Sequence, residues 1–121
     1  MKKQTISFTT AADGSASALG HSALGELYAV EYQPGTTDNG ATIVLTCEGV
    51  GSKPLLTKAT AGTAVAWFYP RDLVHAVADG AALTGTSGGD RTEPLISGVL
   101  KVAVTSGGNA KSGKVIVYYE D

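Results

Sequence analysis

The sequence predicts an all-β fold, a single-domain β-sandwich of the jelly-roll kind spanning residues 1–121. Short runs of residues alternate between apolar side chains and small or polar ones. Segments rich in glycine, proline and asparagine separate these runs. An alternation with a period of two places successive side chains on opposite faces of a strand. A length of 121 residues suits one domain with one modest core.

Six runs carry the alternation, and in each a β-branched or aromatic set lines one face of the expected strand. The sets are Ile6 and Phe8; Tyr28, Val30 and Tyr32; Ile43, Leu45 and Cys47; Val65, Trp67 and Tyr69; Leu100, Val102 and Val104; and Val115, Val117 and Tyr119. The turn sequences 33–35 and 38–40 fall between runs, and Asn39-Gly40 supplies the positive φ of a tight turn.

One segment departs from this pattern. Residues 70–80 fit a short helical turn, with Pro70 near its start, Leu73, Val74 and Val77 on one face, and Gly80 at its end. An irregular strand fits the same residues. We expect a helical turn or a loop excursion.

The composition limits the kinds of binding partner that we expect. Charged residues make up 17% of the chain, which is below the roughly 25% of typical soluble domains. Small neutral residues replace them, and such a surface costs less to bury than one of ions. It suits either an assembly or an ordinary β-protein surface. A net charge of −2 without a basic patch predicts no nucleic-acid partner.

No membrane association is expected, because no apolar run approaches the ~18 residues of a membrane-spanning helix. Residues 1–8 alternate and lack the apolar block of a signal peptide, so we expect synthesis in a cytoplasm.

One motif resembles a phosphate-binding loop. Residues 108–114 match G-x-x-x-x-G-K. However, Val115 replaces the hydroxyl residue that would hold magnesium, and the following residues predict a strand where a phosphate loop needs a helix. We therefore expect a hairpin loop and no bound nucleotide.

Metal and catalytic sites are not expected either. His21 and His75 are the two histidines, and no cysteine pair supports them as zinc ligands. The single cysteine, Cys47, alternates onto an apolar face and is expected to be buried. The sequence thus predicts no enzyme, no metal and no cofactor.

The aromatic group Trp67-Phe68-Tyr69 has two interpretations. Neighbouring strand residues point to opposite faces, so at least one of the three rings reaches an outer face or an edge. An exposed ring would anchor a sugar or a protein partner. Alternatively, residues 71–83 cover the second face, and this is the interpretation we favour. Tyr118 and Tyr119 pose the same question.

Residues 94–108, PLISGVLKVAVTSGG, and 113–120, GKVIVYYE, resemble the closing strands of small structural proteins of tailed bacteriophages. The family in question is the jelly-roll cement or decoration proteins of phage capsids. Over the rest of the chain the resemblance extends only to size and texture.

The resemblance implies a virion structural protein on the outer capsid surface. Its partner would be the major capsid protein, and as a dimer or trimer it would bridge capsomers and stabilise the shell. Residues 1–5 would be an extended N-terminal arm. The expected interface residues are Met1, Lys2, Lys3, Gln4, Thr5, Trp67, Phe68, Tyr69, Tyr118 and Tyr119. The alternatives are a phage tail or fibre component and a carbohydrate-binding module that uses Trp67.

Overall fold

The computed structural model describes residues 1–49, 51–73 and 91–121, and it confirms the all-β fold. Within these ranges the chain forms nine strands and no helix. The strands are β1 (Lys2–Thr9), β2 (Ala16–Gln33), β3 (Thr42–Gly49), β4 (Gly51–Lys58), β5 (Ala66–Phe68), β6 (Asp72–Leu73), β7 (Arg91–Thr92), β8 (Leu95–Thr105) and β9 (Ser112–Glu120).

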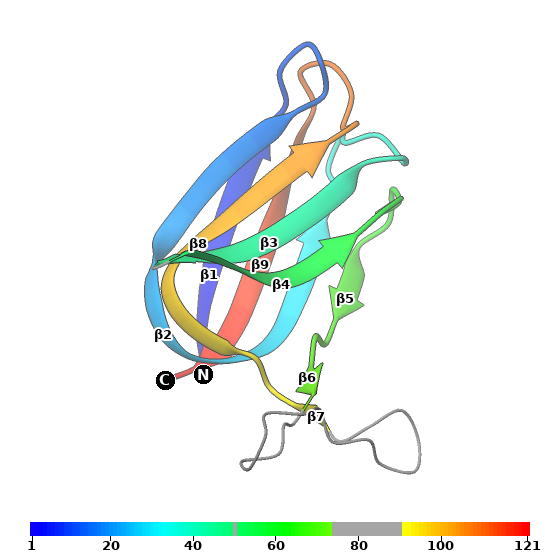
Figure 1. Ribbon diagram of the computed structural model, residues 1–121. Coiled ribbons are helices and arrows are strands. Elements are labelled where there is room, and N and C mark those ends of the chain that lie inside the picture. Colours follow the sequence, from blue (N-terminus) through cyan, green and yellow to red (C-terminus); the bar gives the residue numbers. More distant parts are fainter. Residues whose placement is uncertain (50, 74–90) are drawn as a thin grey trace.

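The main sheet is antiparallel and runs β1-β9-β2-β8-β3-β4, with β5 also paired to β2 (Figure 1). Strands β6 and β7 form a separate small pair. Almost every neighbour in the main sheet is distant in sequence, so the fold depends on long-range pairing.

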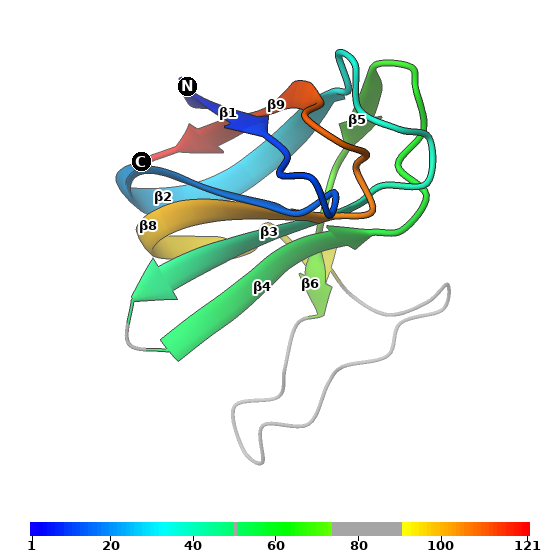
Figure 2. The ribbon, with the colours of Figure 1, turned by 90° about the horizontal axis from the view of Figure 1, so that it is seen from above.

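Strand β2 divides the sheet into two layers. It is 18 residues long; its first part, Ala16 to Glu26, pairs with β8, and its second part, Glu26 to Gln33, pairs with β9. One layer is therefore β2-β8-β3-β4, and the other is β1-β9-β2-β5. Figure 2 shows the two layers facing each other, which is the expected sandwich arrangement.

The change of partner in β2 is centred on Gly25. Its φ is 154°, and a Cβ atom at this position would overlap the backbone carbonyl of Glu120 at the end of β9. Glycine lets β9 approach β2 here at the point where β8 departs.

The apolar sets of β1, β3, β8 and β9 lie between the layers, as the alternation predicts. In β2 the alternation predicts the wrong face of the sheet for one residue, Tyr28. The register shifts between Leu27 and Ala29, so Tyr28 is the extra residue of a bulge. Leu27 is fully buried and Tyr28 is 41% exposed, so Tyr28 does not share the core face of Val30.

Residues 1–5 are not a free arm. Strand β1 pairs with β9 from Lys2 to Thr9, and Ile6 is buried in the core. The Gln4 side-chain amide also bonds both backbone groups of His21 in β2: its Oε1 accepts from His21 N at 2.8 Å, and its Nε2 donates to His21 O at 3.2 Å. The Gln4 amide thus bridges β1 to the first part of β2 and joins the two layers along one side.

The loop 106–111 is not the hairpin that the sequence predicts. It connects β8 to β9, but these two strands are not paired, because β2 lies between them in the sheet. The loop therefore crosses from one layer to the other. It is held by Thr10, whose backbone N bonds Lys111 O at 2.7 Å and whose hydroxyl accepts from Lys111 N at 2.8 Å.

The expected helical turn over 70–80 lies mostly outside the described residues. In the described part, Pro70 and Arg71 are irregular and Asp72–Leu73 form strand β6.

We predict that Gly25→Ala lowers the free energy of unfolding by at least about 2 kcal/mol, because the added methyl group collides with the β9 backbone. Gly40→Ala is the matched control. Gly40 does not have the positive φ expected for this turn, and nothing lies within 4 Å of its Cβ position, so the effect should stay within about 0.5 kcal/mol. Urea unfolding measures both. Equal stability of the two variants would contradict the role given to Gly25.

We also predict that Gln4→Ala costs about 1–2 kcal/mol, because two backbone groups of His21 lose their partner. Lys3→Ala, at an exposed position of the same strand, should change stability little. Amide exchange at His21 should accelerate in Gln4→Ala alone. Unchanged exchange there would show that the bridge does not hold the layers.

Candidate binding surface

The outer face of the layer β1-β9-β2-β5 carries a group of exposed rings. Strand pairing places Trp67 of β5 beside Glu31 of β2, and Glu31 beside Ile116 of β9. We call this surface the aromatic face; its apolar members are Tyr28, Val65, Trp67, Tyr69 and Tyr118. Trp67 is 48% exposed, and Val65 and Tyr69 are each 57% exposed.

Two rings of the aromatic face stack on each other. The centroids of Trp67 and Tyr118 are 5.3 Å apart, with 30° between the ring planes. The Tyr118 hydroxyl donates to Glu31 Oε1 at 3.1 Å, and Gln33 Nε2 donates to Glu31 Oε2 at 2.9 Å. The Glu31 carboxylate therefore fixes the phenol ring against which the indole lies.

The surroundings of Tyr118 raise the pKa of its phenol above the ordinary value. Desolvation is the main cause, and the hydrogen bond to Glu31 and the negative charge of that carboxylate add to it. The folded protein therefore holds this proton more tightly than the unfolded chain does. The associated stability is complete below pH ~10 and is lost as the pH rises through the pKa of the folded state.

The second ring pair depends on the bulge in β2. Tyr28 and Tyr69 meet edge to face, with centroids 6.3 Å apart and planes at 85°. The Arg71 guanidinium lies 5.8 Å from the Tyr28 ring centroid and donates to the Tyr28 carbonyl at 3.0 Å. Arg71 thus holds the bulged residue through both its ring and its backbone.

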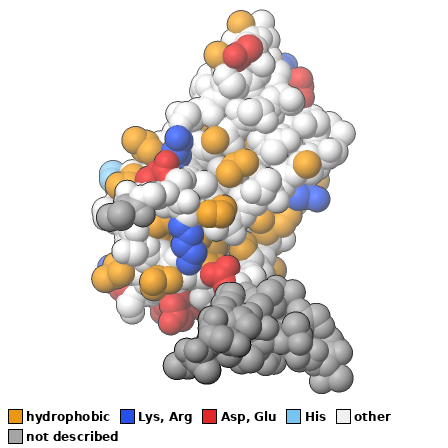
Figure 3. All heavy atoms as spheres, viewed as in Figure 1, with side chains coloured by type: hydrophobic (Ala, Val, Ile, Leu, Met, Phe, Trp, Pro, Cys, Tyr) orange, Lys and Arg blue, Asp and Glu red, His pale blue; other side chains and the backbone are white. Residues whose placement is uncertain are grey.

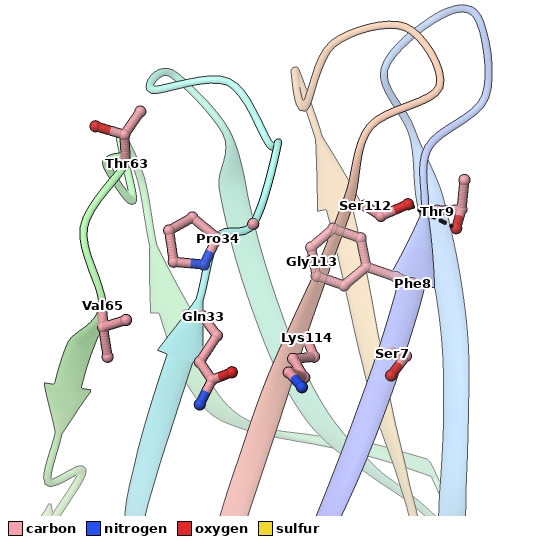
Figure 4. Close-up of a pocket in the computed structure, with 11 residues that line it drawn as sticks. Ser7, Phe8, Thr9, Gln33, Pro34, Thr63, Val65, Ser112, Gly113 and Lys114 are labelled. Carbon is pink, nitrogen blue, oxygen red and sulfur yellow. Dashed lines mark hydrogen bonds between the residues drawn. The ribbon is translucent and has the colours of Figure 1, made fainter.

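A groove adjoins the aromatic face at the end of the layer that carries the inter-layer loops. Its volume is about 650 Å³. Figure 4 shows residues from β1, β2 and β9 and from the segment before β5 around it. The lining residues are Ser7, Phe8, Thr9, Gln33, Pro34, Gly35, Thr63, Val65, Ser112, Gly113 and Lys114. The polar atoms of these side chains belong to hydroxyl, amide and amine groups, and Phe8, Pro34 and Val65 add apolar surface.

The other layer presents a different outer face, which we call the neutral face. It is formed by Ser17, Leu19, Val44, Thr46, Val99 and Ala103, around the pair Lys101 and Glu48. The Lys101 ammonium lies 3.7 Å from the Glu48 carboxylate, so the two charges largely cancel. Leu19 is 67% exposed. Figure 3 shows one side of the molecule, in the view of Figure 1, as a mixture of small hydrophobic and neutral areas with scattered charges.

One edge of the main sheet, strand β4, is protected against adding a further strand. Strand β4 contains Pro54 and a register shift opposite Leu45 and Thr46. Its Lys53 ammonium lies 3.5 Å from the Asp72 carboxylate and donates to a backbone carbonyl of β8. Proline, bulges and edge lysines all disfavour strand addition. Strand β5, at the end of the other layer, has three residues.

The structure brings together only part of the expected interface. Trp67, Tyr69 and Tyr118 share the aromatic face, and Lys3 pairs with Tyr118 at its far side. Phe68 packs against the core and Tyr119 is buried, so these two lie on the inner side of the layer.

Residues 71–83, which we expected to cover the second face of the aromatic strand, lie mostly outside the described residues. Tyr28, Glu31 and Lys114 also belong to this surface, although the sequence pattern did not predict them there. Four successive apolar residues, Leu27 to Val30, break the alternation and were the available signal of a bulge.

The described residues contain no group of three or more His, Cys, Asp or Glu side chains that would hold a metal ion. They include no helix long and apolar enough to cross a membrane. Cys47 is buried, as predicted, and its Sγ accepts a hydrogen bond from Ser97 N at 3.2 Å.

Comparison with known proteins identifies no relative: no protein-family model, no curated protein and no solved structure matches the chain.

We predict that Glu31→Gln lowers the pKa of Tyr118, because the nearby negative charge is removed. Ultraviolet titration measures the phenol, with Tyr118→Phe as the reference that isolates its signal. Glu26→Gln removes a carboxylate farther along the same strand and should leave the pKa of Tyr118 unchanged. The same pKa in Glu31→Gln and the unmodified protein would refute this coupling.

Proposed function

We propose that the chain is a non-enzymatic virion protein that decorates the outer capsid surface of a tailed phage and stabilises the shell. The proposal begins from the resemblance over residues 94–120. In the fold these residues form β8 and β9, the two strands that flank β2. The resemblance therefore covers the centre of both layers.

The observation that carries the proposal is the neutral face. Binding a protein surface requires the removal of water from both partners, and unpaired ions make this costly. On the neutral face the central charges, Lys101 and Glu48, already pair with each other, and short side chains surround them. The aromatic face carries Glu31, Lys114 and Arg71, which makes it the less favourable of the two for this contact.

A protein–protein contact of ordinary size needs only a small part of this protein's surface. A standard interface buries about 800 Å² on each partner, which is about an eighth of the 6560 Å² surface of this chain. A protein present in many copies on one shell also gains from multivalent attachment if it self-associates as a dimer or trimer. The protected β4 edge disfavours a shared strand beside the neutral face, so contact through the face is favoured there.

The expected N-terminal arm, residues 1–5, has no part in the proposed capsid contact. Residues 2–5 belong to β1 and are tied to β9 and to His21. They therefore contribute to the fold of each subunit, and the contact with the major capsid protein is assigned to the neutral face.

We predict saturable co-sedimentation of the purified protein with phage heads at a copy number comparable to that of the capsid subunits. Leu19→Lys and Val44→Lys, each tested alone, should weaken binding at least tenfold, because each buries an unpaired ammonium in the contact. Leu19 pairs with Lys101, and Val44 pairs with Ala103, two residues along the same strand. Thr5→Lys introduces the same charge at an exposed position of the opposite layer and should bind like the unmodified protein.

The same gradients are run with detached tails. Binding to tails but not to heads would replace the capsid assignment with the tail alternative. Binding to neither would overturn the assignment to a virion surface. Circular dichroism of each variant excludes loss of fold as the cause of weaker binding.

A further inference from the structure

We propose that the aromatic face and the adjoining groove form a saccharide-binding site. The ligand class is an oligosaccharide with a pyranose ring that lies on Trp67 and a neighbouring unit in the groove. This function is separate from shell attachment, because the site and the neutral face lie on the outer sides of opposite layers.

The platform for the sugar ring is fixed in advance. One part of the indole contacts Tyr118, and 48% of the Trp67 surface remains open to solvent. Glu31 holds the Tyr118 hydroxyl at 3.1 Å, so the stack loses little freedom when a ligand binds. A rigid aromatic surface of this kind accepts the apolar C–H face of a pyranose.

The groove adds hydrogen-bonding groups to a lining that is otherwise mostly apolar. Val65, which lines the groove, immediately precedes β5 and lies two residues before Trp67, a separation of about 7 Å in an extended chain. Around this point Gln33, Lys114 and Ser7 bring an amide, an ammonium and a hydroxyl to one opening. The volume of about 650 Å³ lies within the range of small-ligand sites.

The orientation of Gln33 connects the two halves. Its amide nitrogen is held by Glu31 at 2.9 Å, the same carboxylate that fixes Tyr118. The amide oxygen of Gln33 is the acceptor that remains for a sugar hydroxyl, while Lys114 is the charged donor among the lining residues. A ring on Trp67 and hydroxyls at Gln33 and Lys114 would therefore be recognised together.

The mixture of groups selects this ligand class over others. A fully apolar ligand would leave the amide and ammonium groups of the groove without partners. An extended peptide normally adds to a sheet edge, and β4 disfavours that through Pro54 and Lys53. Saccharides combine an apolar ring face with many hydroxyls, which matches a stacked indole beside a groove that has both apolar and hydrogen-bonding side chains.

The test uses the intrinsic fluorescence of Trp67, the single tryptophan of the chain. The intact protein is titrated with maltotetraose, chitotetraose, mannotetraose and tetragalacturonic acid, and an array of bacterial surface glycans extends the panel. We expect saturable quenching or a spectral shift with at least one of these sugars. The absence of any response and of any array signal would overturn the proposal.

Variants then locate the binding by calorimetry. Trp67→Ala should abolish heat release with the responding sugar, and Gln33→Ala and Lys114→Ala should each weaken binding at least fivefold. Leu19→Lys, on the neutral face, should bind the sugar like the unmodified protein. Unaltered binding in Trp67→Ala and Gln33→Ala would place the sugar elsewhere and overturn the site.

Co-sedimentation with phage heads separates this site from the shell contact. Trp67→Ala should bind heads as the unmodified protein does. Loss of head binding in folded Trp67→Ala, together with no response to sugars, would show that the aromatic face is a protein contact and would overturn the saccharide assignment. Sugar binding without any head binding would leave the site in place and refute only the capsid proposal.

Discussion

The structure depends on the path of β2 between the two layers. This strand pairs with β8 before Glu26 and with β9 after it, so one continuous backbone belongs to both sheets. The transition requires β9 to approach within a distance that only glycine permits, at Gly25. Because β2 lies between β8 and β9 in the sheet, the loop between these two strands must cross the sandwich, and Thr10 secures it there.

The same transition creates the aromatic face. Immediately after Gly25 the register slips by one residue, and Tyr28 becomes the unpaired residue of the bulge. Its ring therefore turns outward to Tyr69 and Arg71. Downstream, the restored alternation points Glu31 outward beside Trp67. A carboxylate then lies between the rings and the groove, where it orients Tyr118 and Gln33 together.

The free energy needed to remove water differs between the two outer faces. On the neutral face, short side chains surround an ion pair that has already lost much of its interaction with water. On the aromatic face, fixed rings adjoin polar groups that still need partners from a ligand. Two unlike partners suit these faces better than one. A small sandwich without covering helices in its described residues can present both surfaces at once.

The amino-acid sequence by itself determined the all-β class and most of the core, because the alternation of Ile43, Leu45 and Cys47 and of Val115 and Val117 needs only a regular strand. It also placed Trp67 and Tyr69 on one face of one strand. It could not determine which strands meet, since the order β1-β9-β2-β8 joins residues far apart in the chain. The tertiary structure alone decided that Gln4 bridges to His21, that Tyr28 leaves the core, and that Lys114 and Gln33 share a groove, because each depends on register between distant strands.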